Sequence, residues 1–303
     1  VPRPGPPGTA AGEGCRPRRI VSMHCGIGTC LKPLPAAGSF APMASRTIQL
    51  VVQYDGRAFK GWQRQPDVPT VQETLERVLA RLVNAPVTAL GSGRTDAGVH
   101  ATGQSVGVVV PEKWTPDPLR RAMNALLPDT VWVAEAHAMH PDFHARYSAE
   151  ARRYRYLVGL DEGARSPFRR HWEWRPPAPV DVAALRGEAA ALPGEHVFLA
   201  FAVKGTAPAD DDHRCRILSA AWEPRPGGVA FVIEANRFLH HMVRFLVGTM
   251  MDVAMGRRPA GTVAALLAAT NNADVSVPAP AHGLYLEHVT YPRSLYAAPA
   301  VAA

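Results

Sequence analysis

The sequence predicts an α+β protein made of two similar halves. Each half is expected to be a mixed, antiparallel-rich sheet covered by helices. The 303 residues are enough for two domains of about 150 residues each. The hydrophobic fraction of 47% is ordinary for a globular protein. Strand and helix patterns also recur in a similar order in both halves, which is typical of two related α+β units.

In the first half, Ile48, Leu50 and Val52 alternate with polar or smaller residues and predict a strand over residues 47–54. Thr70 and Glu73 form the capping-box pattern that opens a helix. Apolar residues then recur on one helix face to about residue 82. The other elements expected in this half are strands at 87–90, 103–110 and 131–137 and a helix at 117–127.

In the second half, residues 151–160 predict a strand with basic outer positions. A Pro-Gly-Gly sequence predicts the turn of a hairpin. The elements expected after residue 160 are helices at 181–192, 239–255 and 263–268 and strands at 215–223, 228–235 and 284–291.

We expect residues 1–43 to be a disordered N-terminal extension and residues 293–303 to be a disordered tail. The two α+β domains are expected at 44–146 and 147–292. The extension is rich in Pro, Gly and Ala and lacks the apolar surface needed to offset the entropy of ordering. Met43 is the expected natural start, and a transit peptide is the alternative interpretation of this Arg-rich segment.

The formal charge of +7 favours a polyanionic partner. Five basic residues against one acidic residue place +4 of that charge in residues 1–43, which leaves +3 for the remainder. A polyanion would therefore have to bind a local basic face.

Three of the four cysteines also lie in the extension. This distribution argues against a secreted disulfide scaffold and favours the reducing cytoplasm. The spacing of Cys25 and Cys30 fits no standard zinc pattern. No apolar run reaches the roughly 18 residues that a membrane-spanning helix needs.

The segment of chemical interest is a glycine-rich loop at residues 91–100, here called the Asp96 loop. Asp96 stands where a dinucleotide-binding fingerprint would have its third glycine, and a carboxylate there would repel a pyrophosphate. The loop has no Gly-Lys-Ser/Thr and so is no P-loop. Taken alone, it is equally consistent with a structural turn in which Arg94 and Asp96 pair.

The Asp96 loop and its surroundings resemble the bacterial tRNA pseudouridine synthase A (TruA) family over roughly residues 47–291. The loop itself matches from Gly91 to Gln104. Further motifs on both sides of the loop match the family in the same order along the chain. They are Tyr54-Asp55-Gly56, residues 59–65, Val71-Gln72-Glu73, residues 143–149, residues 152–156, residues 236–244 and Gly283-Leu284-Tyr285-Leu286.

The resemblance implies a pseudouridine synthase fold with the active-site cleft between the two halves, and isomerisation of uridines 38, 39 and 40 in the tRNA anticodon arm. It also implies a homodimer that uses no cofactor and no metal. The family's catalytic aspartate falls on Asp96, and its stacking aromatic residue falls on Tyr154. Arg94 precedes the aspartate by two residues as in the family, Arg244 falls on a basic partner of the aspartate, and Leu284 falls on a residue lining the base pocket.

A carboxylate suits this reaction in either of two ways. It acts as a nucleophile at C1′, as in retaining glycosidases, or as a base that removes a C2′ proton. Both routes need Asp96 ionised, and a neighbouring guanidinium from Arg94 or Arg244 would favour that state. No second acid is required, because the uracil stays in the site and no water is activated.

The remaining candidates concern RNA binding. Trp62 is expected to be a packing anchor. His240 and His241 are placed on one helix, where adjacent residues point about 100° apart and cannot chelate one ion well. They are expected to serve packing or phosphate contacts. Candidate phosphate contacts are Arg64, Arg146, Arg152, Arg153 and Arg155.

Two other functions remain open from the residues alone. A non-catalytic RNA-binding module would keep the basic face but would not need a carboxylate in a glycine-rich loop. A nucleoside or sugar hydrolase would release free uracil from tRNA.

Overall fold

The computed structural model describes residues 44–206, 210–269 and 271–297. The expectations for residues 1–43 and 298–303 fall outside this range. The described residues form a sheet of nine strands in the order β4-β1-β3-β9-β5-β8-β7-β6, with β2 paired to β3. None of the helices described is long and apolar enough to span a bilayer.

The first half contains two helices and four strands. Thr70 Oγ1 accepts a hydrogen bond from the backbone N–H of Glu73 at 3.4 Å, so the predicted helix cap is confirmed. Asn84 ends this helix in the left-handed conformation, with φ of 56°. The elements are β1 (Ser45–Tyr54), α1 (Val71–Val83), β2 (Leu90–Gly91), β3 (His100–Pro111), α2 (Pro116–Asn124) and β4 (Val131–Met139).

The second half contains three helices and five strands. The predicted hairpin is present, and Arg225 pairs with Gly228 across its turn. The elements are β5 (Ala151–Gly159), α3 (Val182–Ala189), β6 (Gly194–Val197), β7 (Arg214–Arg225), β8 (Gly228–Ala235), α4 (Met242–Ala254), α5 (Thr262–Leu267) and β9 (Leu284–Thr290). Short 3₁₀ turns lie at Gly56–Ala58, Glu162–Arg165, Leu199–Phe201, Ala281–Gly283 and Arg293–Leu295.

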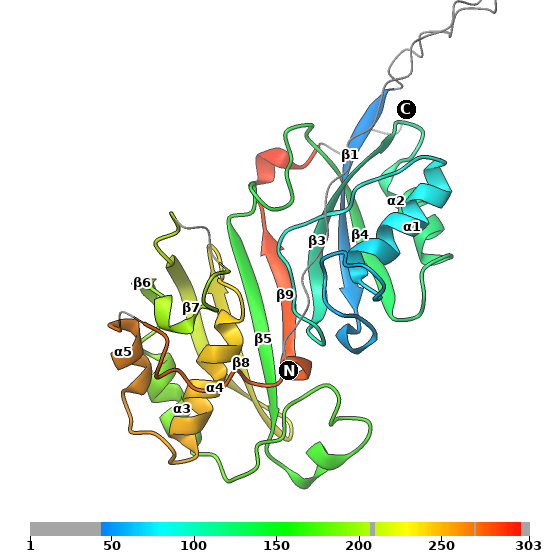
Figure 1. Ribbon diagram of the computed structural model, residues 1–303. Helices are drawn as coiled ribbons and strands as arrows, with labels where there is room; N and C mark the ends of the chain where they lie inside the picture. Colours follow the sequence, from blue (N-terminus) through cyan, green and yellow to red (C-terminus); the bar gives the residue numbers. More distant parts are fainter. Residues whose placement is uncertain (1–43, 207–209, 270, 298–303) are drawn as a thin grey trace, which may run out of the picture. The chain divides into compact units, whose positions relative to one another are not determined.

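The last strand, β9, joins the two halves into one sheet (Figure 1). It runs parallel to β3, with His100 opposite Tyr285, and antiparallel to β5, with Tyr154 opposite Leu286. The Asp96 loop immediately precedes β3, so this pairing brings the loop beside the start of β9 and beside β5. The division into two domains at residues 146 and 147 stays a prediction.

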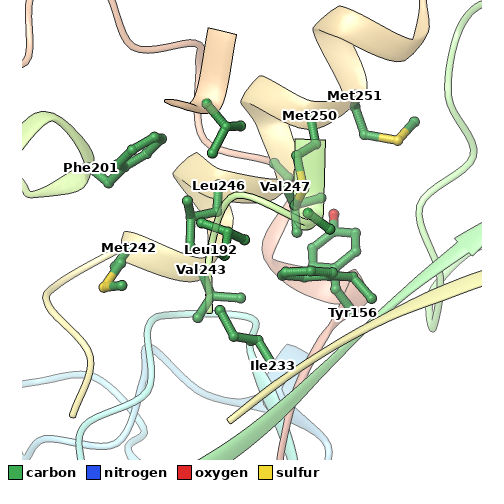
Figure 2. Close-up of a cluster of buried hydrophobic side chains, with 14 of the residues drawn as sticks. Tyr156, Leu192, Phe201, Ile233, Met242, Val243, Leu246, Val247, Met250 and Met251 are labelled. Carbon is green, nitrogen blue, oxygen red and sulfur yellow. The ribbon is translucent and has the colours of Figure 1, made fainter. Parts of the chain in front are cut away.

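Two clusters of buried side chains stabilise the fold, one mainly in each half, and β9 contributes Leu286 and Val289 to the cluster of the first half. In the second half, α4 packs Leu246 and Val247 near Tyr156 of β5 and Ile233 of β8 (Figure 2). Burying a leucine or valine side chain contributes roughly 1.5–3 kcal/mol. This packing fixes α4 on the sheet and thereby sets the position of its first turn, which carries Arg244.

The start of α4 differs from the prediction. The helix was expected to include His240 and His241, but it begins at Met242. His241 has φ of 61° and ψ of 0°, a left-handed conformation that no helix residue adopts. The apolar periodicity therefore extends upstream of the first residue of the helix. The strand expected at 87–90 is only Leu90–Gly91, and β6 was not predicted.

Candidate active site

The Asp96 loop is held by the segment that precedes α1. Tyr54 Oη lies 2.7 Å from Thr95 Oγ1, and the backbone N–H of Trp62 donates to the Thr95 carbonyl at 3.0 Å. Tyr54 is 5% exposed and Thr95 7%. The side chain and the backbone carbonyl of Thr95, the residue before Asp96, are therefore both fixed by buried hydrogen bonds, which are costly to break.

Glycine is required where this segment meets the loop. Gly61 has φ of +99°, and a Cβ there would lie 2.9 Å from the Thr95 carbonyl oxygen. A Cβ on Gly91 would lie 2.6 Å from the ring of Trp62. Trp62 is 3% exposed, so its predicted role as a packing anchor is confirmed.

The start of the Asp96 loop is held from the opposite side. Ser92 Oγ donates to Gln104 Oε1 at 2.7 Å, and Gln104 Nε2 donates to the Gly93 carbonyl at 2.9 Å. Arg152 of β5 donates to the Ser92 carbonyl at 3.2 Å. Its guanidinium also donates to the carbonyl oxygens of Arg146, Ala149 and Asn236.

Asp96 is paired with Arg244 from the first turn of α4. Arg244 Nη1 lies 3.0 Å from Asp96 Oδ2, and Arg244 Nε donates to the Ala279 carbonyl at 2.8 Å. The Asp96 side chain is 17% exposed and the Arg244 side chain 15%. The hydrogen bond to the Ala279 carbonyl orients the guanidinium, so the positive group beside the carboxylate is held in a fixed position.

Two histidines also face the Asp96 carboxylate. His240 Nε2 lies 3.5 Å from Oδ1, and His241 Nε2 lies 3.3 Å from Oδ2. Burial lowers the pKa of His241, the nearby Asp96 charge opposes this, and His240 and Arg244 lower it further. The expectation that these adjacent residues lie on one helix and cannot face one ligand was wrong, because both precede α4 and His241 is left-handed. Their expected role in packing or phosphate contacts stays a prediction.

Tyr154 of β5 lines the same cleft as Asp96. Burial raises the pKa of its phenol, and the Asp96 charge raises it further. The Tyr154 ring meets the edge of Phe238, with centroids 5.0 Å apart and planes at 85°. A neutral ring held in this way presents an apolar surface beside the carboxylate.

These groups border a cleft of about 1200 Å³, which is lined by residues from both halves. Leu284, which is 5% exposed, lies in its wall. Six basic side chains and two acidic ones line the cleft. The basic residues are Lys60, Arg94, Arg146, Arg152, Arg237 and Arg244, and the acidic residues are Asp96 and Asp211.

The structure brings seven of the ten residues predicted to act in catalysis or to contact the base or phosphate to this cleft. Arg94 is exposed there, and the partner of Asp96 among the described residues is Arg244 rather than Arg94. The seven are Asp96, Arg94, Arg244, Tyr154, Leu284, Arg146 and Arg152.

The other three predicted residues do not line the cleft and are engaged with carboxylates. Arg64 lies 3.0 Å from Glu76 Oε2. Arg153 lies 2.9 Å from Glu234. Arg155 contacts both Glu287, at 2.7 Å, and Glu223, at 3.3 Å.

Sequence reasoning missed the supports of the site. Tyr54, Gln104 and Arg152 all hold the Asp96 loop, yet none was proposed to do so. Each lies inside a motif that carries the family resemblance. Their place in these motifs was the signal available from the sequence, because the residues that they contact are distant in the chain.

Comparison with known proteins agrees with this arrangement. The sequence profile of the family described as tRNA pseudouridine synthase matches residues 50–148 and 189–292. Similar relatives that carry the name tRNA pseudouridine synthase A include those from Myxococcus xanthus, Methylobacterium nodulans and Exiguobacterium sibiricum. The one from Myxococcus xanthus is 42% identical over 246 residues, covering 80% of this chain and 91% of the relative.

The relative from Methylobacterium nodulans is 41% identical over 253 residues, covering 83% of this chain and 98% of the relative. The relative from Exiguobacterium sibiricum is 38% identical over 250 residues, covering 82% and 98%. An antiparallel-rich α+β fold with a carboxylate in a basic cleft fits an RNA-modifying enzyme. The family match and these relatives show that this chain belongs to the tRNA pseudouridine synthase family.

Proposed function

We propose that this protein isomerises uridine to pseudouridine in tRNA, with Asp96 as the carboxylate that acts on the ribose. The observation that carries this proposal is the pairing of Asp96 with Arg244 in a basic cleft beside the ring of Tyr154. A single ionised carboxylate next to an apolar ring suits a reaction in which the base leaves the sugar and remains bound.

The reaction breaks the bond between N1 and C1′ and forms a bond between C5 and C1′. The uracil loses the proton at C5 and gains one at N1, so no atom leaves the site. Asp96 attacks C1′ or removes the C2′ proton, and the later steps return it to its starting state. In either route Arg244, held by the Ala279 carbonyl, keeps the charge of Asp96 balanced before and after the step.

The target uridine has to leave its stack before Asp96 reaches the sugar. Unstacking costs a few kcal/mol, and stacking on an aromatic ring returns roughly 1–3 kcal/mol. Tyr154 is an aromatic ring in the cleft that fits this role, and Leu284 lines the same cleft. Arg94, which is exposed at the cleft, fits the space that the flipped base vacates.

The backbone of tRNA would follow the basic side chains of the cleft. Lys60, Arg94 and Arg146 line it and form no ion pair with other described residues. Arg152 is already committed to four carbonyl oxygens. Arg64, Arg153 and Arg155 would have to exchange a carboxylate for a phosphate, so we rank them below Arg146 as phosphate contacts.

The finer assignments rest on the family resemblance. They are action at positions 38, 39 and 40, a homodimer, a cytoplasmic location and a reaction without cofactor or metal. Light scattering at micromolar concentration tests the homodimer, and a monomer would contradict it. Sequencing that maps pseudouridine in tRNA from cells lacking this protein tests the positions, which are expected to remain uridine.

The isomerase proposal is tested by following one tRNA through two assays. We expect pseudouridine to form without release of free uracil. Uracil release would indicate a hydrolase instead. Stable tRNA binding with neither product would indicate a non-catalytic RNA-binding module.

A further inference from the structure

Three side chains of metal-binding type converge at the mouth of the cleft. Asp96, His240 and His241 each offer one ligand atom, and these atoms lie within 4.8 Å of one another. The two imidazole rings are 4.0 Å apart between centroids. The left-handed conformation of His241 makes this possible, because it turns two adjacent side chains toward one carboxylate.

The spacing fits a small ion held by two imidazoles and one carboxylate. Zn²⁺ binds imidazole nitrogen and carboxylate oxygen at about 2.0–2.2 Å, and a tetrahedron of that size has edges of roughly 3.3 Å. The His241–Asp96 separation is 3.3 Å and the His240–Asp96 separation is 3.5 Å. The two histidines face different oxygens of Asp96, and the three ligand atoms lie within 4.8 Å of one another, so the side chains must move closer together to hold one ion.

The ligand types select the class of ion. Imidazole suits zinc, copper, nickel, cobalt and ferrous iron, whereas magnesium and calcium prefer oxygen ligands alone. Three protein ligands would leave the remaining coordination positions to water. His240 is 46% exposed, so an ion has a path in from solvent.

Arg244 limits the affinity of this site. Its Nη1 lies 3.0 Å from Asp96 Oδ2, the oxygen that His241 also faces. A guanidinium beside a cation is unfavourable, and the ion would compete with it for the carboxylate. The site is therefore suited to reversible occupancy rather than to a permanently bound ion.

We propose that Asp96, His240 and His241 form an inhibitory site for a borderline divalent ion such as Zn²⁺. The bound ion would take the Asp96 oxygens that the ribose needs, so occupancy by the ion and turnover exclude each other. The inhibitory consequence rests on the proposed function, whereas ion binding itself does not.

The test is a titration of the full chain with Co²⁺, followed by absorption. Co²⁺ held by nitrogen and oxygen shows visible bands without the near-ultraviolet thiolate band that the cysteines of residues 1–43 would add. We expect the nitrogen–oxygen spectrum to be lost in His240→Gln and in His241→Asn, the latter chosen because asparagine tolerates the left-handed conformation. Thermal unfolding of each variant checks that it is folded.

The matched control is His137→Gln. His137 Nε2 lies 2.9 Å from Glu135 Oε2 and forms a histidine–carboxylate pair that lacks a second imidazole. We expect this variant to bind Co²⁺ like the parent. Arg244→Gln, which removes the opposing charge, is expected to bind it at least about tenfold more tightly.

Identical Co²⁺ titrations of the parent and the two histidine variants would overturn the proposed site, as would a spectrum showing thiolate ligation alone. In a pseudouridine assay, Zn²⁺ is expected to stop turnover and a chelator to restore it. Full turnover with the site occupied would overturn the inhibitory role. Failure to make pseudouridine without added metal would count against the proposed function and leave the Co²⁺ result intact.

Discussion

Arg244 Nη1 lies 3.0 Å from Asp96 Oδ2, although the two residues are 148 positions apart in the chain. The contact joins the first turn of α4 to the loop before β3. It depends on β9, which lies between β3 and β5 and brings the halves together. The candidate catalytic carboxylate of one half is thus paired with a guanidinium from the other half.

Replacing Arg244 tests this relationship. We expect Arg244→Met to lower the single-turnover rate at least about a hundredfold, equivalent to roughly 2.7 kcal/mol, because the Asp96 carboxylate loses its paired charge. Arg244→Lys keeps the charge but not the forked hydrogen bonds and should be intermediate. Equal rates for the Met variant and the parent would show that the pair is unimportant for turnover.

Tyr154 is expected to act through its ring. Tyr154→Phe keeps the stacking surface and should retain most activity. Tyr154→Leu should lower kcat/KM by about tenfold to a hundredfold, which corresponds to a stacking contribution of roughly 1–3 kcal/mol. If the Phe variant were as impaired as the Leu variant, the hydroxyl rather than the ring would be the important group.

Arg152 is expected to position the Asp96 loop rather than to bind phosphate. Arg152→Lys keeps the charge but loses most of the contacts to four carbonyl oxygens. We expect a fall in kcat of about tenfold or more with little change in tRNA affinity, since hydrogen bonds from a charged donor contribute about 1.5–3 kcal/mol each. Arg146→Lys is the matched control and should keep near-parental kcat. A parental kcat for Arg152→Lys would contradict the positioning role.

His100 provides a test of stability against pH. Its side chain is buried, burial lowers its pKa, Asp55 opposes this, and Arg57 and His282 lower the pKa further. The unfolded chain takes up this proton near pH 6.5, but the folded chain does so only at lower pH. Stability is therefore lost as the pH falls from about 6.5 through the lowered folded-state pKa.

The measurement is the midpoint of thermal unfolding at several pH values. We expect the midpoint of the parent to decrease on acidification through this window, and the decrease to be smaller in His100→Gln. Because His241 and His282 also have lowered pKa values, the difference between variant and parent is the relevant quantity. Identical pH profiles would show that His100 contributes nothing to the effect.

Local patterns were sufficient to predict most of the elements. The alternation in β1 and the Thr70 cap of α1 depend on neighbouring residues only, and both were located closely. Pairing between distant strands has no such local signal. The sequence therefore predicted two similar halves but did not predict that β9 would join them into one sheet.

The candidate site shows the same division. Asp96, Tyr154 and Leu284 were found through motifs, and the cleft contains all three. The phosphate role predicted for Arg153 and Arg155 did not take into account Glu234 and Glu287, which are distant in sequence and adjacent in space. The contact of His241 with Asp96 was missed because backbone handedness at one residue is not evident from apolar periodicity.

The central claim is that Asp96 performs the chemistry on tRNA. Asp96→Asn keeps the size of the side chain and removes its charge. Pseudouridine formation and tRNA binding are measured on the same preparation of this variant, which separates catalysis from binding. We expect formation to be abolished while the dissociation constant for tRNA stays within a few-fold of the parent value. Full turnover by Asp96→Asn would contradict the account.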